Sequence, residues 1–138
     1  MPSPYRTRIT DVPLERDLRE DEGWIDMHVQ FLIDARAAGS RDLVVGRTVL
    51  PAGARHERHL HPHADEFLVV MSGRGEVYTN TGREPSSAGD VIYTPRGNWH
   101  GFDNTSDEDV LLLWGWSGAG SLEAAGYALP GPDDSFDE

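Results

Sequence analysis

The sequence predicts an all-β fold of the barrel or jelly-roll type. Short runs of strand-forming residues follow one another along the chain, and glycine- or proline-containing turns separate them at close spacing. The chain has 138 residues, which suits one compact domain, and no internal repeat of 20 to 50 residues is apparent. A single barrel is therefore expected.

The strands can be placed one by one. In residues 26–34, Met27, Val29, Phe31 and Ile33 alternate with more polar positions, which is typical of a strand with one buried face. Residues 110–116 are apolar on both faces, as in a strand that is covered on both sides. Between turn signals, further strands are expected over residues 42–50, 66–71, 74–79 and 91–94.

The two ends of the chain look different from its centre. Residues 1–24 are polar and rich in proline, and we expect an arm with one helical turn at most. Residues 25–122 are assigned to the barrel. Residues 123–138 contain several glycines and prolines and end in acidic residues, which predicts a flexible tail.

Composition excludes several classes of function. The formal charge is −12 and the pI is about 4.7, so binding to nucleic acid or to an anionic membrane is not expected. No apolar run approaches 18 residues and no secretory signal is seen, which predicts a cytoplasmic protein. All 12 basic residues are arginine and there is no cysteine, so Schiff-base and thiol chemistry are excluded.

Four residues have the chemistry of a metal site. His59 and His61 are two positions apart, so on a strand both imidazoles project to the same side. Glu66 follows on the next extended run, and a hairpin between the two strands would bring its carboxylate beside them. His100, after the turn at Pro95, could come from a separate strand. Three neutral nitrogens and one carboxylate suit one divalent Fe, Mn, Ni, Co or Zn ion.

The same residues carry a resemblance to the cupin family. Two motifs of that family are matched without a gap, by Gly53, His59, His61, Glu66 and Gly73, and by Gly89, Pro95, Gly97, His100 and Asn104. The resemblance covers the central third of the chain. It implies a single double-stranded β-helix barrel in which His59, His61, Glu66 and His100 bind the metal.

Strand parity also suggests a substrate pocket. Leu68 and Val70 share the parity of Glu66, and Phe102 shares that of His100. The remaining candidates are Trp114 and Trp116 for the wall, Tyr78 and Tyr93 for a polar or catalytic group, and Arg47 for pairing with a substrate anion. His28, His56 and His63 are expected at the surface or behind the metal ligands.

Three functions are compatible with this site. We expect an enzyme acting on a small organic molecule that chelates the metal through two oxygens, and dioxygenase-type oxygenation is favoured. The alternatives are a non-redox isomerase, cyclase or lyase acting on a sugar or a polyketide, and a small-molecule binding protein. The 2-oxoglutarate oxygenases would require His-x-Asp, whereas His61 stands at that position. A homodimer is expected, with residues 26–34 covering a sheet edge.

Overall fold

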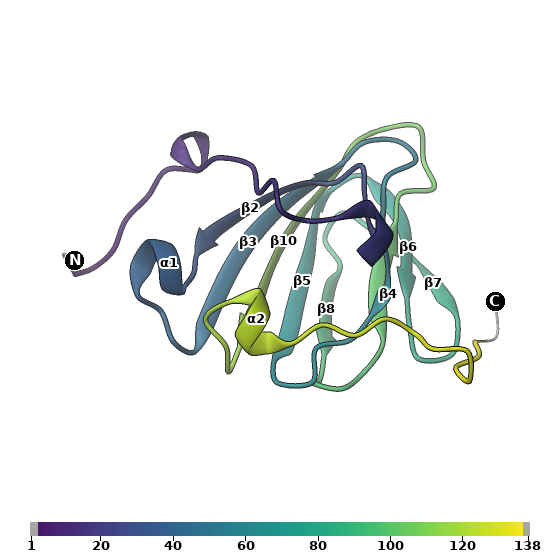
Figure 1. The fold of residues 1–138 in the computed structure, drawn as a ribbon. Coiled ribbons are helices and arrows are strands. Elements are labelled where there is room, and N and C mark those ends of the chain that lie inside the picture. The colour runs from purple at the N-terminus through teal and green to yellow at the C-terminus, as the bar shows by residue number, and fades with distance from the viewer. Residues whose placement is uncertain (1–2, 137–138) are drawn as a thin grey trace.

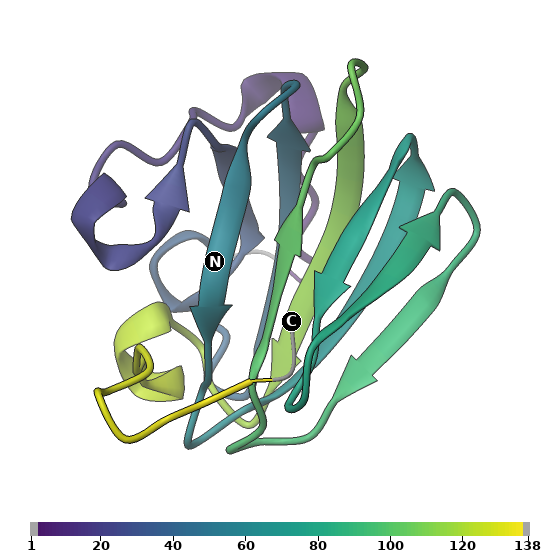
Figure 2. The same ribbon diagram turned by 90° about the vertical axis from the view of Figure 1, so that its right-hand side faces the viewer.

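The computed structural model describes residues 3–136; residues 1–2 of the predicted arm and 137–138 of the predicted tail lie outside the described residues. Its core is formed by two five-stranded sheets (Figures 1 and 2). One sheet has the order β2 (His28–Ile33), β3 (Leu43–Leu50), β10 (Val110–Ser117), β5 (Asp65–Ser72), β8 (Val91–Thr94). The other has the order β1 (Trp24–Ile25), β4 (Arg55–His59), β9 (His100–Asp103), β6 (Arg74–Tyr78), β7 (Arg83–Ser87). The all-β jelly-roll prediction is confirmed.

Every strand pair is antiparallel. β10 is the central strand of its sheet and pairs with both β3 and β5. Its alternating residues Leu112, Trp114 and Trp116 are buried between the sheets, and its outward-facing leucines are half-buried. The strand was predicted to be covered on both faces; its inner face is buried, whereas its outer face is only half-buried.

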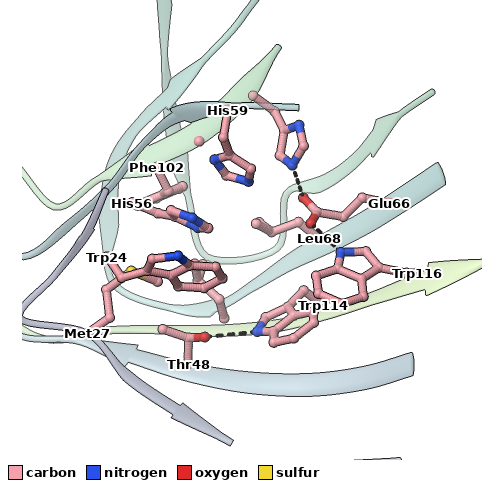
Figure 3. Close-up of a pocket in the computed structure, with 13 residues that line it drawn as sticks. Trp24, Met27, Thr48, His56, His59, Glu66, Leu68, Phe102, Trp114 and Trp116 are labelled. Atoms are coloured by element: carbon pink, nitrogen blue, oxygen red, sulfur yellow. Dashed lines mark hydrogen bonds and ion pairs between the residues drawn. The ribbon is translucent and has the colours of Figure 1, made fainter. Parts of the chain in front are cut away.

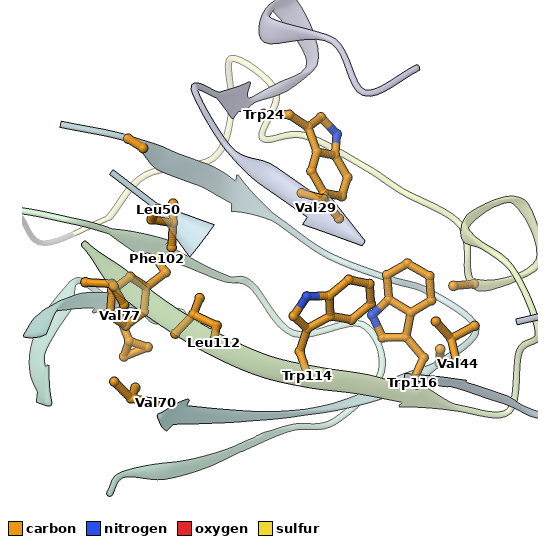
Figure 4. Packing of buried hydrophobic residues seen from close by; sticks show 14 of the residues in the cluster. Trp24, Val29, Val44, Leu50, Val70, Val77, Phe102, Leu112, Trp114 and Trp116 are labelled. Carbon is orange, nitrogen blue, oxygen red and sulfur yellow. The ribbon is translucent and has the colours of Figure 1, made fainter. Parts of the chain in front are cut away.

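The hydrophobic core lies between the two sheets (Figure 4). Trp114 occupies its middle, and its indole lies directly over Gly46 of β3, where an added Cβ would come within 2.1 Å of the ring. Only glycine allows the indole to lie this close to the neighbouring strand. The indole N–H donates a 2.8 Å hydrogen bond to Thr48 Oγ1, which satisfies the polar atom of a buried side chain.

The predicted hairpin between the strands that carry His59 and Glu66 is wrong. β4 pairs with β1 and β9, whereas β5 pairs with β10 and β8 in the opposite sheet. The chain crosses from one sheet to the other between the two strands. Glu66 therefore faces the histidines across the interior of the barrel.

The predicted strands over residues 42–50, 66–71, 74–79, 91–94 and 110–116 are confirmed, with shifts of one residue at their ends. β7 was not predicted, because its sequence contains Pro85 and has few apolar residues. It forms the edge of its sheet, where a missing backbone donor is tolerated.

The N-terminal segment lies against the edge strand β2. It has two short 3-10 turns, Ile9–Asp11 and Glu20–Glu22. Gln30 donates to the carbonyl oxygens of Ile9 and Val12 at 2.9 and 2.8 Å, and the Glu15 N–H donates to Val29 O at 2.7 Å. This packing explains why the polar Gln30 is buried. The homodimer, which was inferred from the same strand, stays a prediction.

Both flanks contribute to the packed domain beyond the predicted boundaries. Trp24, expected in the arm, forms part of β1 and of the core. Helix α1 (Ala35–Ala38) follows β2, and helix α2 (Leu122–Ala125) follows β10. Residues of the predicted flexible tail pair with the barrel, since Leu60 and Ala128 exchange two backbone hydrogen bonds of 3.0 Å. Within residues 3–136, no helix is long and apolar enough to cross a membrane.

Asn104 fastens the loop before β10. Its side-chain amide donates to the carbonyl oxygens of Leu50 and Glu108 at 2.8 and 2.7 Å, and its oxygen accepts hydrogen bonds from Ser106.

We expect Asn104→Ala to lower the free energy of unfolding by about 1–3 kcal/mol, because buried carbonyl groups lose their donors. Urea unfolding of the metal-free protein measures this loss. The exposed neighbour Thr105→Ala is the control, and an equal effect of both substitutions would contradict the assignment.

Candidate metal centre and adjoining pocket

Four buried side chains from both sheets meet in the interior of the barrel. One donor atom from each lies within 4.8 Å of the others, and the set consists of His59, His61, Glu66 and His100. His59 ends β4 and pairs in register with His100, the first residue of β9. His61 lies two residues beyond the end of β4. Glu66 approaches from β5 in the opposite sheet (Figure 3).

Backbone carbonyls fix the tautomer of each histidine. Nδ1 of His59 lies 2.7 Å from Glu57 O, Nδ1 of His61 lies 2.7 Å from Gly126 O, and Nδ1 of His100 lies 3.2 Å from Asn98 O. A carbonyl oxygen only accepts, so each Nδ1 carries the proton and, in a neutral ring, each Nε2 presents a lone pair. The three Nε2 atoms therefore converge as bare acceptors.

These Nε2 atoms are the buried side-chain polar atoms without a hydrogen bond in the part of the chain that the structure describes. Buried polar atoms are normally satisfied, so three orphaned acceptors in one place require an explanation. Two of them also face a carboxylate, since Glu66 Oε2 lies 3.1 Å from His100 Nε2 and Glu66 Oε1 lies 3.6 Å from His61 Nε2. Acceptors facing acceptors repel unless a proton or a cation lies between them.

The charge of the site supports the same conclusion. Burial opposes ionisation of Glu66, but the neighbouring imidazoles of His100 and His61 outweigh it and lower the pKa of the carboxyl below its usual range. Burial likewise opposes protonation of His100, and the Glu66 carboxylate outweighs it and raises the pKa of this imidazole. Trp116 Nε1 donates a 2.9 Å hydrogen bond to Glu66 Oε1, which holds the carboxylate in place.

The residues present fit a divalent metal ion. Three imidazole nitrogens and one carboxylate favour transition metals over Mg²⁺ or Ca²⁺, which prefer oxygen donors. The Nδ1 protons already point to carbonyl oxygens, the arrangement that usually supports metal-binding histidines. His59, His61, Glu66 and His100 are thus the candidate ligands of one metal.

A pocket with a mostly apolar wall adjoins these residues (Figure 3). Of the predicted wall residues, Leu68, Phe102, Trp114 and Trp116 line it. Val70 is fully buried but lies deeper in the core, toward the end where Val77 packs (Figure 4). Parity therefore gave the correct face for Val70 but not its depth. The cavity volume is about 30 Å³, so the pocket is small.

The three predicted polar or catalytic candidates do not line this pocket. Tyr93 is 66% exposed on β8, because its neighbour Thr94 takes the inward position opposite Glu66. Arg47 alternates with the inward-facing Thr48 on β3, and its guanidinium donates to Gln30 Oε1 at 3.1 Å. Tyr78 is buried, but its hydroxyl lies 3.5 Å from Asp103 Oδ2, away from the pocket residues.

Sequence reasoning missed six lining residues, namely Trp24, Met27, Thr48, His56, Gly101 and Leu112. The register of β4 against β9 shifts between His56 and His59, and this irregularity brings the two rings onto the same side although they are three residues apart. Their centroids are 3.7 Å apart. Simple alternation could not have found His56. His28 and His63 are exposed, as expected.

The tautomer of His56 is also determined. Tyr127 donates its only hydroxyl proton to Glu22 O at 2.5 Å, and His56 Nε2 lies 3.1 Å from the same hydroxyl oxygen. Nε2 must therefore be the donor, which leaves Nδ1 as the acceptor nitrogen. Burial lowers the pKa of His56 well below its usual value, so the ring is neutral.

Comparison with known proteins gives one family match and several similar proteins. Residues 46–116 match the profile of the family described as Cupin domain. Protein SchB of Streptomyces halstedii is 30% identical over 86 residues, which are 62% of each chain. The oxalate-binding protein of Thermotoga maritima is 28% identical over 108 residues, 77% of this chain and 88% of that protein.

A solved structure with the same fold is that of the polyketide cyclase RemF from Streptomyces resistomycificus. It superposes with a TM-score of 0.75 at 22% sequence identity, over 94% of this chain and 88% of that one.

Replacing one ligand should remove the metal. We expect His61→Ala and His100→Ala to retain little zinc after dialysis, because neither water nor a neighbour restores the geometry. His63→Ala is the matched control, since His63 is exposed and close in sequence but outside the cluster. Elemental analysis of untagged protein measures the metal content. Full occupancy in both ligand variants would refute the assignment.

Metal affinity should fall on acidification. The pKa of His100 is raised in the metal-free protein, whereas a ligand imidazole must be neutral, so the proton competes with the metal as pH falls through that pKa. Above it, affinity should be nearly independent of pH. Below it, the dissociation constant should rise about tenfold per pH unit for one competing proton. The difference in Tm between zinc-loaded and chelator-treated protein should shrink accordingly, and a constant difference would contradict this linkage.

Proposed function

This chain belongs to the cupin family, and we propose that it is a metal-dependent isomerase or cyclase acting on a flat, conjugated molecule with two neighbouring oxygen atoms. The observation that carries the proposal is that a neutral imidazole outside the metal cluster, His56, lines the same pocket as His59, Glu66 and His100. A site with a metal and a separate proton acceptor suits enolisation and the rearrangements that follow it.

The pocket wall favours ligands that have an apolar, aromatic or conjugated surface. The indole N–H groups of Trp114 and Trp116 are both occupied, the first by Thr48 and the second by Glu66. These side chains therefore offer apolar ring surface to a ligand. Trp24 and Phe102 add further aromatic surface. The ring surfaces of this wall favour a planar, conjugated ligand. Because the cavity is small, a wall residue must move for such a ligand to enter, and the unbranched Met27 is best able to do so.

The polar groups of the pocket argue against a sugar substrate. The lining contains neither arginine nor lysine to bind a phosphate. Apart from the metal cluster, the polar side-chain groups of its lining are the Thr48 hydroxyl, the His56 imidazole and the tryptophan N–H groups, and the N–H groups of Trp114 and Trp116 already have acceptors. A molecule with many hydroxyl groups would leave most of them unpaired on entering. The sugar alternative is therefore not favoured, while the polyketide alternative remains.

A bound metal would supply the positive charge that stabilises an enolate through its oxygens. The protein's own contribution is to orient the substrate and accept a proton. We assign the proton-accepting role to Nδ1 of His56, because Nε2 is engaged with Tyr127. Tyr127 keeps the ring in this tautomer. The imidazole stacks on His59 and makes a tilted contact with Trp24, at 3.7 and 3.9 Å between centroids, and these contacts hold its orientation.

Two relatives give partial support. RemF is named a polyketide cyclase, and the Thermotoga maritima protein is named for oxalate, a small dianion with neighbouring oxygens. A planar β-polycarbonyl compound combines both features. Oxygenation is the second candidate, since the three-histidine, one-glutamate set also suits iron or manganese.

The experiment that tests the proposal compares metals and atmospheres. Zinc-, manganese- and iron-loaded protein is incubated with an aromatic β-diketone, a catechol, oxalate and a sugar phosphate, under nitrogen and under oxygen. We expect conversion of the β-diketone by the zinc form under nitrogen. Turnover only with oxygen and a redox-active metal would instead establish oxygenation, and tight binding without turnover would make the protein a binding module.

His56→Phe tests the assigned proton acceptor. Phenylalanine keeps a ring between Trp24 and His59 but lacks the nitrogen, so we expect kcat to fall about 10²- to 10⁴-fold while zinc content stays unchanged. His28→Phe is the matched control, because His28 is exposed and remote from the pocket lining. Unchanged kcat in His56→Phe would remove this residue from the mechanism.

A further inference from the structure

We propose that the C-terminal strap, residues 121–128, orients a ligand of the metal site, so that docking of the strap and binding of the metal stabilise each other. This inference rests on metal binding by the four clustered residues and not on the reaction catalysed. The strap follows β10 and contains helix α2 (Figure 1).

The three ligand histidines differ in where their supporting carbonyl comes from. For His59 and His100 the acceptor belongs to the residue two positions earlier in the chain, Glu57 and Asn98. For His61 the acceptor is Gly126 O, 65 residues away. Local geometry therefore orients two of the rings, whereas the strap orients the third.

The backbone at Gly126 is shaped for this contact. It has φ 78° and ψ 162°, a conformation that strains any residue with a side chain. An added Cβ would also come within 2.7 Å of Pro62 Cγ, next to His61. Any residue other than glycine must therefore change the position of the carbonyl oxygen that accepts from His61.

The rest of the strap is bound to the backbone on either side of His61. Ala125 is fully buried, and its carbonyl accepts from the His63 N–H at 3.0 Å. Ala128 exchanges two backbone hydrogen bonds with Leu60, the residue between His59 and His61. The docked strap thus contacts the backbone on both sides of His61.

Tyr127 connects the strap to the other side of the cluster. Its ring stacks on His59 and Trp24, with centroids 5.0 and 5.5 Å apart, and its hydroxyl binds Glu22 O and His56. Tyr127 is not among the residues lining the pocket, so its contacts are with the histidines and Trp24 and not with the pocket interior.

The energetic consequence is reciprocal. If the docked strap holds His61 in the tautomer that binds metal, then metal binding must favour the docked strap by the same free energy. The strap is therefore expected to open more readily in the metal-free protein.

A pair of glycine substitutions tests this on the intact chain. Gly126→Ala should raise the zinc dissociation constant about 10- to 100-fold, the usual effect of losing a supporting contact to a ligand. Gly131→Ala is the matched control, because an added Cβ there meets only Asp134 Oδ2 at 3.8 Å. Competition with a chromophoric chelator gives both constants. Equal affinity in Gly126→Ala and the wild type would overturn the proposal while leaving the metal site and the proposed function intact.

Hydrogen exchange of the wild-type chain provides a second measurement that needs no substitution. Zinc should slow exchange of the Gly126 and Ala128 amides, which donate to Leu122 O and Leu60 O. The reference is the Gly39 amide, which closes α1, a helix of equal length outside the site. Equal slowing of both helices, or none at the strap, would overturn the coupling. A wild-type chain that binds no zinc would overturn it together with the metal site.

Discussion

The arrangement of the site depends on one electrostatic constraint, the burial of the Glu66 carboxylate opposite three imidazole nitrogens. Glu66 projects from β5 into an interior that also contains Trp116, Trp114 and Leu68. An anion in such surroundings is costly unless positive charge compensates it. A proton shared with His100 can do so only in part, because two further lone pairs remain unsatisfied. A divalent cation would satisfy all four groups at once.

Residue spacing and strand alternation explain which parts of the site could be predicted from the sequence and which could not. The cluster of candidate ligands was predictable because its residues and turn glycines have fixed spacing, and Leu68, Trp114 and Trp116, which were chosen by strand alternation, lie along the pocket. Alternation failed at His56, where a shift in strand register changes the side on which the ring lies. It also could not show that β4 and β5 belong to different sheets, because sheet partners are chosen by long-range packing.

The C-terminal segment shows a different limit. Its glycines, prolines and acidic residues are typical of a flexible tail, yet residues 121–128 are held by buried and backbone contacts with the site. Composition reports how much apolar area a segment can bury, and here Ala125 and Tyr127 bury it against the barrel. The decisive contact is a backbone carbonyl, that of Gly126, which no side-chain pattern encodes.

Satisfied and unsatisfied polar groups together define the chemistry that the pocket offers. The indole N–H groups of Trp114 and Trp116 and the Nδ1–H groups of the candidate ligand histidines have partners within the protein. Under the proposed function, the substrate oxygens bind at the metal cluster and the transferred proton goes to Nδ1 of His56. Because these positions adjoin one small, mostly apolar pocket, a ligand that binds with its oxygens at the metal cluster is expected to lay its conjugated surface against the tryptophans. Recognition by this protein is therefore expected to depend on planarity and on the spacing of two oxygens more than on charge.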